Sequence, residues 1–122
     1  EAISCSFAST VDVYATIADL TGTGTTDIND SKSFKNTFSD QNKGTRNYIY
    51  SEVGNNSNSN TDYTIRNSTH KYIIDDGTEA LYNLSINEFE NPNLMAPSRL
   101  PLSTSDSIIK AELEAEVVRI RL

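Results

Sequence analysis

Few residues of this sequence could carry out nucleophilic chemistry. It contains one cysteine, Cys5, and one histidine, His70. A cysteine nucleophile needs a base, so Cys5 would depend on His70, and we interpret Cys5 instead as a small apolar residue. Ser68 and Thr69 directly precede His70, too near in sequence for the geometry of a Ser-His-Asp triad. We therefore predict a plain sheet or surface histidine and no catalytic residue in this chain.

The sequence also lacks the patterns that are typical of metal and phosphate sites. A single histidine excludes a multi-histidine zinc site. The run Asp75-Asp76-Gly77 lacks the alternating oxygen ligands and final glutamate of a calcium loop, so we predict a hairpin turn there. Thr21–Gly24 lacks the lysine and helix of a phosphate loop. Asp12 and Asp19 could share one side of a helix and act as a carboxylate pair. Carboxylates at such positions more commonly stabilise a helix end or lie on a solvated face.

Two cationic residues, Arg66 and Lys71, bracket the turn of a predicted hairpin. Such side chains can contact an anion at the rim of a neighbouring active site. They can equally balance the negative charge of carboxylates nearby in the sequence, namely Glu52, Asp75, Asp76 and Glu79. The residue types alone leave both roles open.

Short runs rich in Ile, Tyr and Leu, bounded by Asn, Asp and Gly, predict strands joined by tight turns. We expect four strands, at residues 47–53, 63–66, 70–74 and 80–84. The Asn- and Ser-rich run 54–60 between the first two is too polar to bury and is predicted to be a loop.

Helical spacing predicts a helix over Ser9–Leu20. Val13, Ile17 and Leu20 form its apolar stripe, Ser9 or Thr10 would cap its start, and Gly22 would end it. Residues 31–38 are expected to add one or two helical turns.

A second helix is predicted over Asp106–Leu122, with Ser105 as its cap. Its apolar stripe consists of Ile109, Leu113, Val117 and Ile120. Together these elements predict an α+β fold, in which a small four-stranded antiparallel sheet is packed by the long C-terminal helix and joined to an N-terminal helix.

Composition limits the function. The chain has 122 residues, which favours one domain, and a net charge of −7, which disfavours binding to nucleic acid or an anionic membrane surface. The hydrophobic fraction of 36% is low against the usual level of about 45 to 50% counted with glycine, and adding the 5 glycines barely closes the gap. Either the core is small or the domain packs against a partner.

Ordered sequence motifs resemble the C-terminal region of sulfatases of the alkaline phosphatase superfamily. The match runs through Arg66, Lys71–Ile73, Asp76–Gly77, Glu79–Ser85, Glu90 and Asn93–Leu94, and upstream through Ser9–Gly22, Ser31–Phe34 and Tyr50–Glu52. Asn83, Asn87 and Glu88 depart from the Asp, Asp and Pro that are usual in that family.

The resemblance implies a C-terminal subdomain fragment of a hydrolase of sulfate esters. Residues 1–45 would be a helix and connecting segment from the edge of the main α/β domain, and residues 46–122 the sheet and C-terminal helix. In the family, that main domain carries a formylglycine nucleophile within a C/S-x-P-x-R motif and a divalent ion, usually calcium. Cys5 lacks this motif, so the catalytic half would lie outside this chain.

Further expectations follow from the resemblance. The partners would be the missing N-terminal α/β domain and a sulfated small molecule or carbohydrate. Arg66, His70 and Lys71 would lie at the substrate-pocket rim, and the location would be extracytoplasmic. Two alternatives stay open: a phosphoryl-transferring relative (phosphodiesterase, phosphonate hydrolase or phosphoglycerol transferase) and a free-standing binding module.

Overall fold

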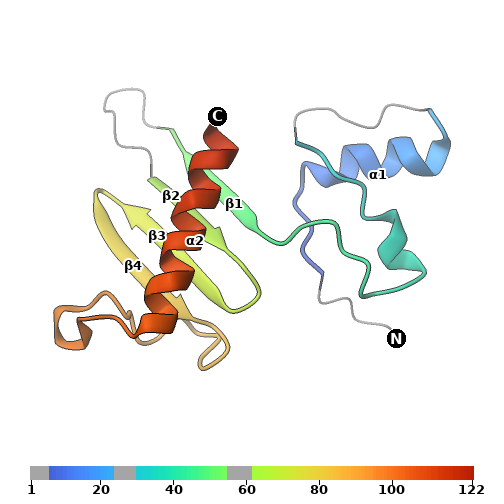
Figure 1. Cartoon of the computed structure of the whole chain (residues 1–122). Helices are drawn as coiled ribbons and strands as arrows, with labels where there is room; N and C mark the ends of the chain where they lie inside the picture. The colour runs from blue at the N-terminus through green and yellow to red at the C-terminus, as the bar shows by residue number, and fades with distance from the viewer. Residues whose placement is uncertain (1–5, 24–29, 55–61) are drawn as a thin grey trace. The chain divides into compact units, whose positions relative to one another are not determined.

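The computed structural model describes residues 6–23, 30–54 and 62–122. The chain forms two compact units, Glu1–Ile49 and Tyr50–Leu122, which are described separately. The elements are α1 (Asp12–Thr21), the 3-10 turn η1 (Lys35–Phe38), β1 (Ile49–Val53), β2 (Asp62–Arg66), β3 (His70–Asp75), β4 (Thr78–Asn83), the 3-10 turn η2 (Pro97–Arg99) and α2 (Thr104–Arg121), as Figure 1 shows.

The four predicted strands form one sheet in the order β1-β2-β3-β4, so the predicted meander is confirmed. The β2–β3 and β3–β4 pairs are antiparallel. The turn between β3 and β4 consists of Asp76 and Gly77, whose φ angles are +47° and +74°. Positive φ at both central residues is typical of the two-residue hairpin turn that follows the twist of the strands, so the predicted turn is also confirmed.

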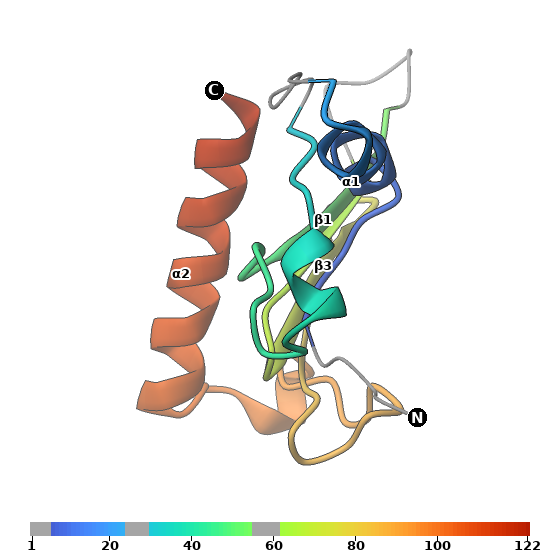
Figure 2. The same ribbon diagram turned by 90° about the vertical axis from the view of Figure 1, so that its right-hand side faces the viewer.

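The helix α2 covers one face of the sheet (Figure 2). Ile65, Tyr72 and Leu81 lie side by side on adjacent strands, and each is at most 1% exposed. Leu113 and Val117 are the buried residues of α2, in agreement with the predicted stripe. The helix starts earlier than predicted, because the Ser103 side chain, and not that of Ser105, accepts a hydrogen bond from the Asp106 backbone N–H.

The apolar stripe predicted for α1 lies on its exposed side. Val13, Ile17 and Leu20 are 47–56% exposed, whereas Ala15, Thr16 and Ala18 are buried. The segment after the helix lies against this small-residue face, since the Ala15 N–H donates to Ser31 Oγ at 3.0 Å and the Phe34 N–H donates to Thr16 Oγ1 at 3.1 Å. The predicted cap is wrong, because the N-cap residue is Val11, which provides no side-chain hydrogen bond.

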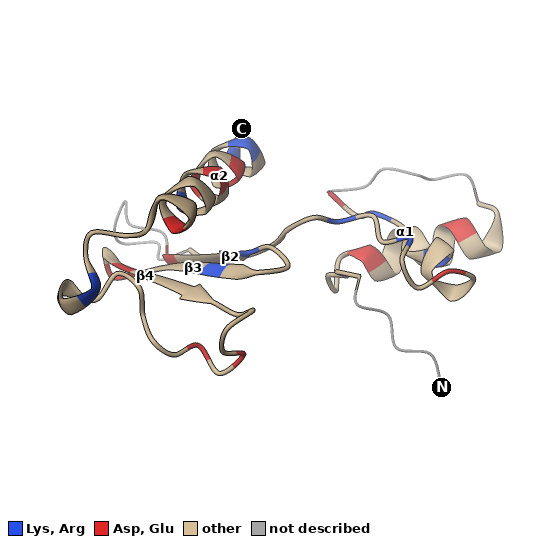
Figure 3. Cartoon of the chain, turned by 60° about the horizontal axis from the view of Figure 1, so that its bottom comes forward, with Lys and Arg blue, Asp and Glu red and all other residues tan. Residues whose placement is uncertain are grey.

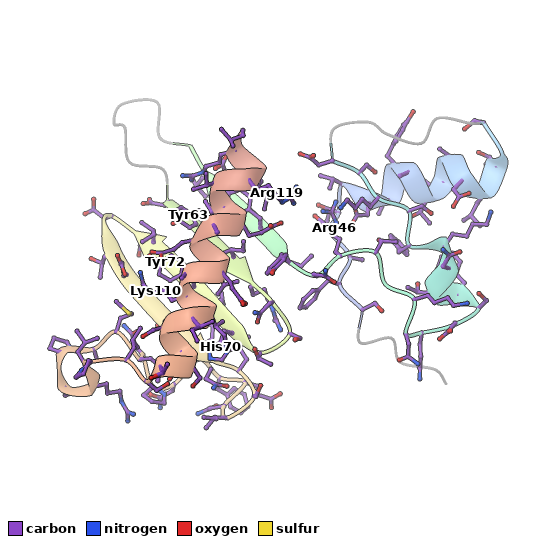
Figure 4. The ribbon with its side chains drawn as sticks, in the orientation of Figure 1. Arg46, Tyr63, His70, Tyr72, Lys110 and Arg119 are labelled. Carbon is purple, nitrogen blue, oxygen red and sulfur yellow. The ribbon has the colours of Figure 1, made fainter. Side chains whose placement is uncertain are left out.

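Asp12 is the centre of the first unit (Arg46, its partner, is labelled in Figure 4). It lies in the first turn of α1, as predicted, but its side chain is only 1% exposed. Arg46 donates to both of its oxygens, from Nε at 2.6 Å and from Nη2 at 2.5 Å. The backbone N–H groups of Ser9 and Lys32 also donate to it, at 2.7 and 2.8 Å. The carboxylate therefore joins four separate parts of the unit.

The surroundings of Asp12 keep it ionised. Burial opposes the charged form, but the hydrogen bonds from Arg46 and from the two backbone groups outweigh that cost and lower the pKa of Asp12. A lowered pKa stabilises the folded state above the unfolded-state pKa of about 3.9, and this contribution is lost as the pH falls through the folded-state value.

The substitution Asp12→Asn leaves Arg46 without its carboxylate partner and is expected to destabilise the first unit by about 3 kcal/mol at neutral pH. Amide hydrogen exchange in α1 measures this free energy apart from that of the sheet. The matched control is Asp19→Asn, because Asp19 pairs with Lys35 at 3.3 Å with both side chains about half exposed, and such pairs contribute at most about 1 kcal/mol. Equal effects of the two substitutions would contradict the central place of Asp12.

Candidate functional site

Arg66 and Lys71 lie opposite each other in the β2–β3 ladder. Their neighbours Ile65 and Tyr72 point towards α2 and are buried. Because successive side chains of a strand alternate between faces, Arg66 and Lys71 project from the face that α2 does not cover. The structure therefore places these two predicted rim residues together, on one face of the sheet.

A carboxylate compensates this pair of positive charges. Lys71 Nζ lies 2.6 Å from Glu90 Oε1, and the two side chains remain 24% and 39% exposed. Two like charges directly opposite each other in a sheet repel, so Glu90 makes the arrangement less unfavourable. An incoming anion would compete with Glu90 for Lys71.

Two hydroxyl groups lie on the same face. Tyr82 is the β4 neighbour of Lys71, and Thr64 is two residues before Arg66 on β2. The buried Thr64 Oγ1 has no hydrogen-bond partner within the described part of the chain. Two cations with the Tyr82 hydroxyl beside them can bind a sulfate or carboxylate group, and this set of three residues, Arg66, Lys71 and Tyr82, is named here the cationic face.

His70 lies on the other face of the sheet, below α2, and is 3% exposed. Its Nε2 donates to Asp106 Oδ1 at 3.1 Å, and its Nδ1 lies 2.9 Å from Thr69 Oγ1. Hydrogen bonds from Ser103 and His70 outweigh burial and lower the pKa of Asp106, so its carboxylate is charged at neutral pH. The structure thus separates His70 from Arg66 and Lys71.

The chain Thr69–His70–Asp106 has the connectivity of a nucleophile, base and orienting acid, although Thr69 directly precedes His70 in the sequence. Because His70 is buried under α2, a substrate cannot approach it. The arrangement instead fastens the first turn of α2 to β3. The alternative partner of His70, Cys5, lies outside the described residues.

A second polar cluster between α2 and the sheet was not predicted. Lys110 Nζ lies 2.6 Å from Glu114 and 3.0 Å from Glu79, and 4.9 Å from the centre of the Tyr72 ring. Figure 4 shows Lys110 and Tyr72 between helix and sheet. Burial disfavours the charged lysine, but the two carboxylates outweigh it and raise the pKa of Lys110. Only the four-residue spacing of Lys110 and Glu114 could have indicated part of this cluster.

The carboxylates of the described residues do not form a metal site. Within residues 6–23, 30–54 and 62–122, no group of three or more His, Cys, Asp or Glu side chains could hold a metal ion. Asp12 is engaged by Arg46, and Asp19 by Ser33 and Lys35. Over the same ranges, no helix is long and apolar enough to cross a membrane.

No protein-family model and no curated protein matches the chain. Solved structures do. One is a protein from Bacteroides thetaiotaomicron assigned to the sulfatases, and another is a 2-O GAG sulfatase; each has a TM-score of 0.67 and 22% identity. A third, with a TM-score of 0.63 and 17% identity, was solved with its substrate D-glucosamine-2-N,6-O-disulfate.

The likeness extends over 90% of this chain and 24% of each of these three proteins. The chain thus spans about a quarter of their length. Identity at this level shows the fold alone, and it confirms the α+β fold that the sequence motifs implied. The chain has the fold of one part of the sulfatases.

Proposed function

We propose that this chain is the C-terminal, non-catalytic portion of an enzyme that hydrolyses sulfate esters. In that enzyme it completes the fold, and its cationic face forms part of the rim of the substrate pocket. The observation that carries the proposal is the likeness to sulfatases over 90% of the chain. Fold alone does not fix function, so the proposal also depends on two surfaces of the chain.

The first surface is the exposed side of α1. Val11, Val13, Tyr14, Ile17 and Leu20 are all about half exposed along a helix of ten residues. Val13, Ile17 and Leu20 share one side of the helix, with Tyr14 beside them, and an exposed apolar stripe of this kind commonly marks an interface. The proposal assigns this side of α1 to the interface with the catalytic domain. The hydrophobic fraction of this chain is only 36%, and the catalytic domain would supply the apolar residues against which the helix packs.

The second surface is the cationic face. Arg66 and Lys71 are adjacent across the β2–β3 ladder, and Lys71 is held by a half-exposed glutamate that an anion can replace. A sulfated sugar presents the matching charge. The similar protein solved with a disulfated glucosamine supports a sulfated carbohydrate as the substrate class.

The proposal places the catalytic groups outside this chain. The formylglycine nucleophile and the calcium ion would belong to the catalytic domain, and no step of the reaction is assigned to residues described here. The role of the chain is to bind and orient the substrate, chiefly through Arg66 and Lys71.

The isolated chain is therefore expected not to hydrolyse an aryl sulfate, with or without added calcium, whereas the intact enzyme hydrolyses it. The measurement is release of the phenol product, followed by absorbance. Calcium-dependent turnover by the purified chain would overturn the non-catalytic assignment. If the intact enzyme instead cleaved aryl phosphate diesters in preference to sulfates, the sulfatase assignment would be wrong.

In the intact enzyme, Arg66→Ala and Lys71→Ala are expected to raise KM for a sulfated saccharide about tenfold, because each removes about 1.4 kcal/mol of binding, while kcat changes little. Lys43→Ala is the control, since Lys43 is also an exposed lysine near a carboxylate, 3.8 Å from Asp40. A lower unfolding temperature with an unchanged KM would make both residues structural.

Ile17→Glu tests the proposed α1 interface. In the isolated chain this 56% exposed side chain is expected to change the unfolding free energy by less than about 0.5 kcal/mol. In the intact enzyme the glutamate would be buried against the catalytic domain, and the unfolding temperature is expected to fall by several degrees. The interface is refuted if thermal unfolding of both proteins is equally insensitive to the substitution.

A further inference from the structure

The helix α2 carries a second apolar stripe, on the side that faces away from the sheet. Ile108, Val118 and Leu122 are 56%, 60% and 101% exposed, and Ala111 and Ala115 are exposed as well. The five positions follow one another at alternating intervals of three and four residues. This is the heptad spacing by which one helix packs along another.

The stripe is separate from the residues that hold α2 on the sheet. Leu113 and Val117 are buried, and Lys110 and Glu114 make the polar contacts with Tyr72 and Glu79. Figure 2 shows the sheet on one side of α2 only. The outer stripe is therefore available without disturbing the second unit.

We propose that this outer stripe is an interface with a second copy of the chain, in which the two α2 helices run antiparallel. The sizes of the side chains support this direction. Around a twofold axis between Glu116 and Val117, Ala115 lies opposite Val118 of the second copy and Ala111 lies opposite its Leu122, whereas Ile108 lies outside these layers. Each layer then combines a small with a large residue and fills the space. A parallel arrangement would set alanine against alanine in two layers and leave voids.

The charges beside the stripe support the same direction. Glu112 flanks its middle and Arg119 its C-terminal end. Figure 3 shows acidic residues along α2 and basic residues near its C-terminal end. The antiparallel pair places Glu112 near Arg119 of the second copy, which gives two opposite-charge pairs in the dimer. A parallel pair would need Glu114 beside Arg119, but Glu114 contacts Lys110 and Tyr72 on the side of the sheet.

These charges can reach a second copy from where they are. The Arg119 side chain is 67% exposed while it contacts Glu116 at 2.5 Å. Side chains paired on the surface exchange partners at little cost. The complementary charges set the direction of the helices, and the apolar stripe supplies the attraction.

The interface is small. Four helical turns bury less than the roughly 800 Å² per partner of a standard stable interface. We therefore expect a weak dimer, whose population rises with protein concentration.

Sedimentation velocity of the 122-residue chain over a hundredfold concentration range tests the proposal. The chain is expected to shift from monomer to dimer, and Val118→Glu is expected to keep it monomeric with unchanged circular dichroism. Ile17→Glu, on the exposed side of α1, is the matched control and is expected to leave the dimer intact. A monomer at every concentration, or a dimer lost with Ile17→Glu but kept with Val118→Glu, overturns the proposal.

Charge exchange tests the direction of the helices. Glu112→Arg and Arg119→Glu are each expected to weaken the dimer. In a dimer of either variant, residue 112 of one copy and residue 119 of the other carry charges of the same sign. An equimolar mixture of the two variants restores every opposite-charge pair and is expected to dimerise at least as well as the parent chain. A mixture that associates no better than either variant alone rules out the antiparallel interface.

Discussion

The second unit depends on one row of buried side chains, Ile65, Tyr72 and Leu81, which crosses three adjacent strands below α2. Side chains alternate between the two faces along each strand. Once these residues face the helix, their neighbours Arg66 and Lys71 must face the opposite way. The same constraint that builds the core therefore also builds the cationic face. A shift of the register by one residue would exchange the two faces.

The interface below α2 is unusually polar for a unit of this size. His70 joins Asp106 at the start of the helix, Lys110 joins Glu79 and Glu114 in the middle, and Arg121 lies 4.6 Å above the Tyr63 ring at the end. Buried polar groups contribute little net stability, but they specify one arrangement when each has a partner. They hold α2 in a fixed position along the sheet, so few apolar residues suffice.

The fold could be predicted from the sequence where the pattern is local. Alternation and turn residues located the four strands and the Asp76-Gly77 turn, and the stripe of Leu113 and Val117 gave the inner side of α2. The same reasoning located the apolar stripe of α1 but not the side of the helix that is buried within this chain. The residues buried there are alanines and a threonine, which fit the close approach of the segment 31–34. Periodicity identifies an apolar side of a helix but does not say what covers it.

The candidate site could be predicted only in part. The pairing of Arg66 with Lys71 follows from a hairpin register that strand lengths suggest, whereas the position of His70 depends on contacts with Asp106, 36 residues away. No local pattern carries such long-range contacts, and the same holds for Asp12 and Arg46. The Arg66–Lys71 pair therefore remains the part of the site on which the functional proposal rests.

A crystal structure of the intact enzyme with a bound sulfated saccharide tests the central claim most directly. The account predicts that the apolar side of α1 is buried against the catalytic domain and that Arg66 or Lys71 lies within hydrogen-bond distance of the saccharide. An α1 that is exposed to solvent, together with a saccharide bound far from both cations, would contradict it.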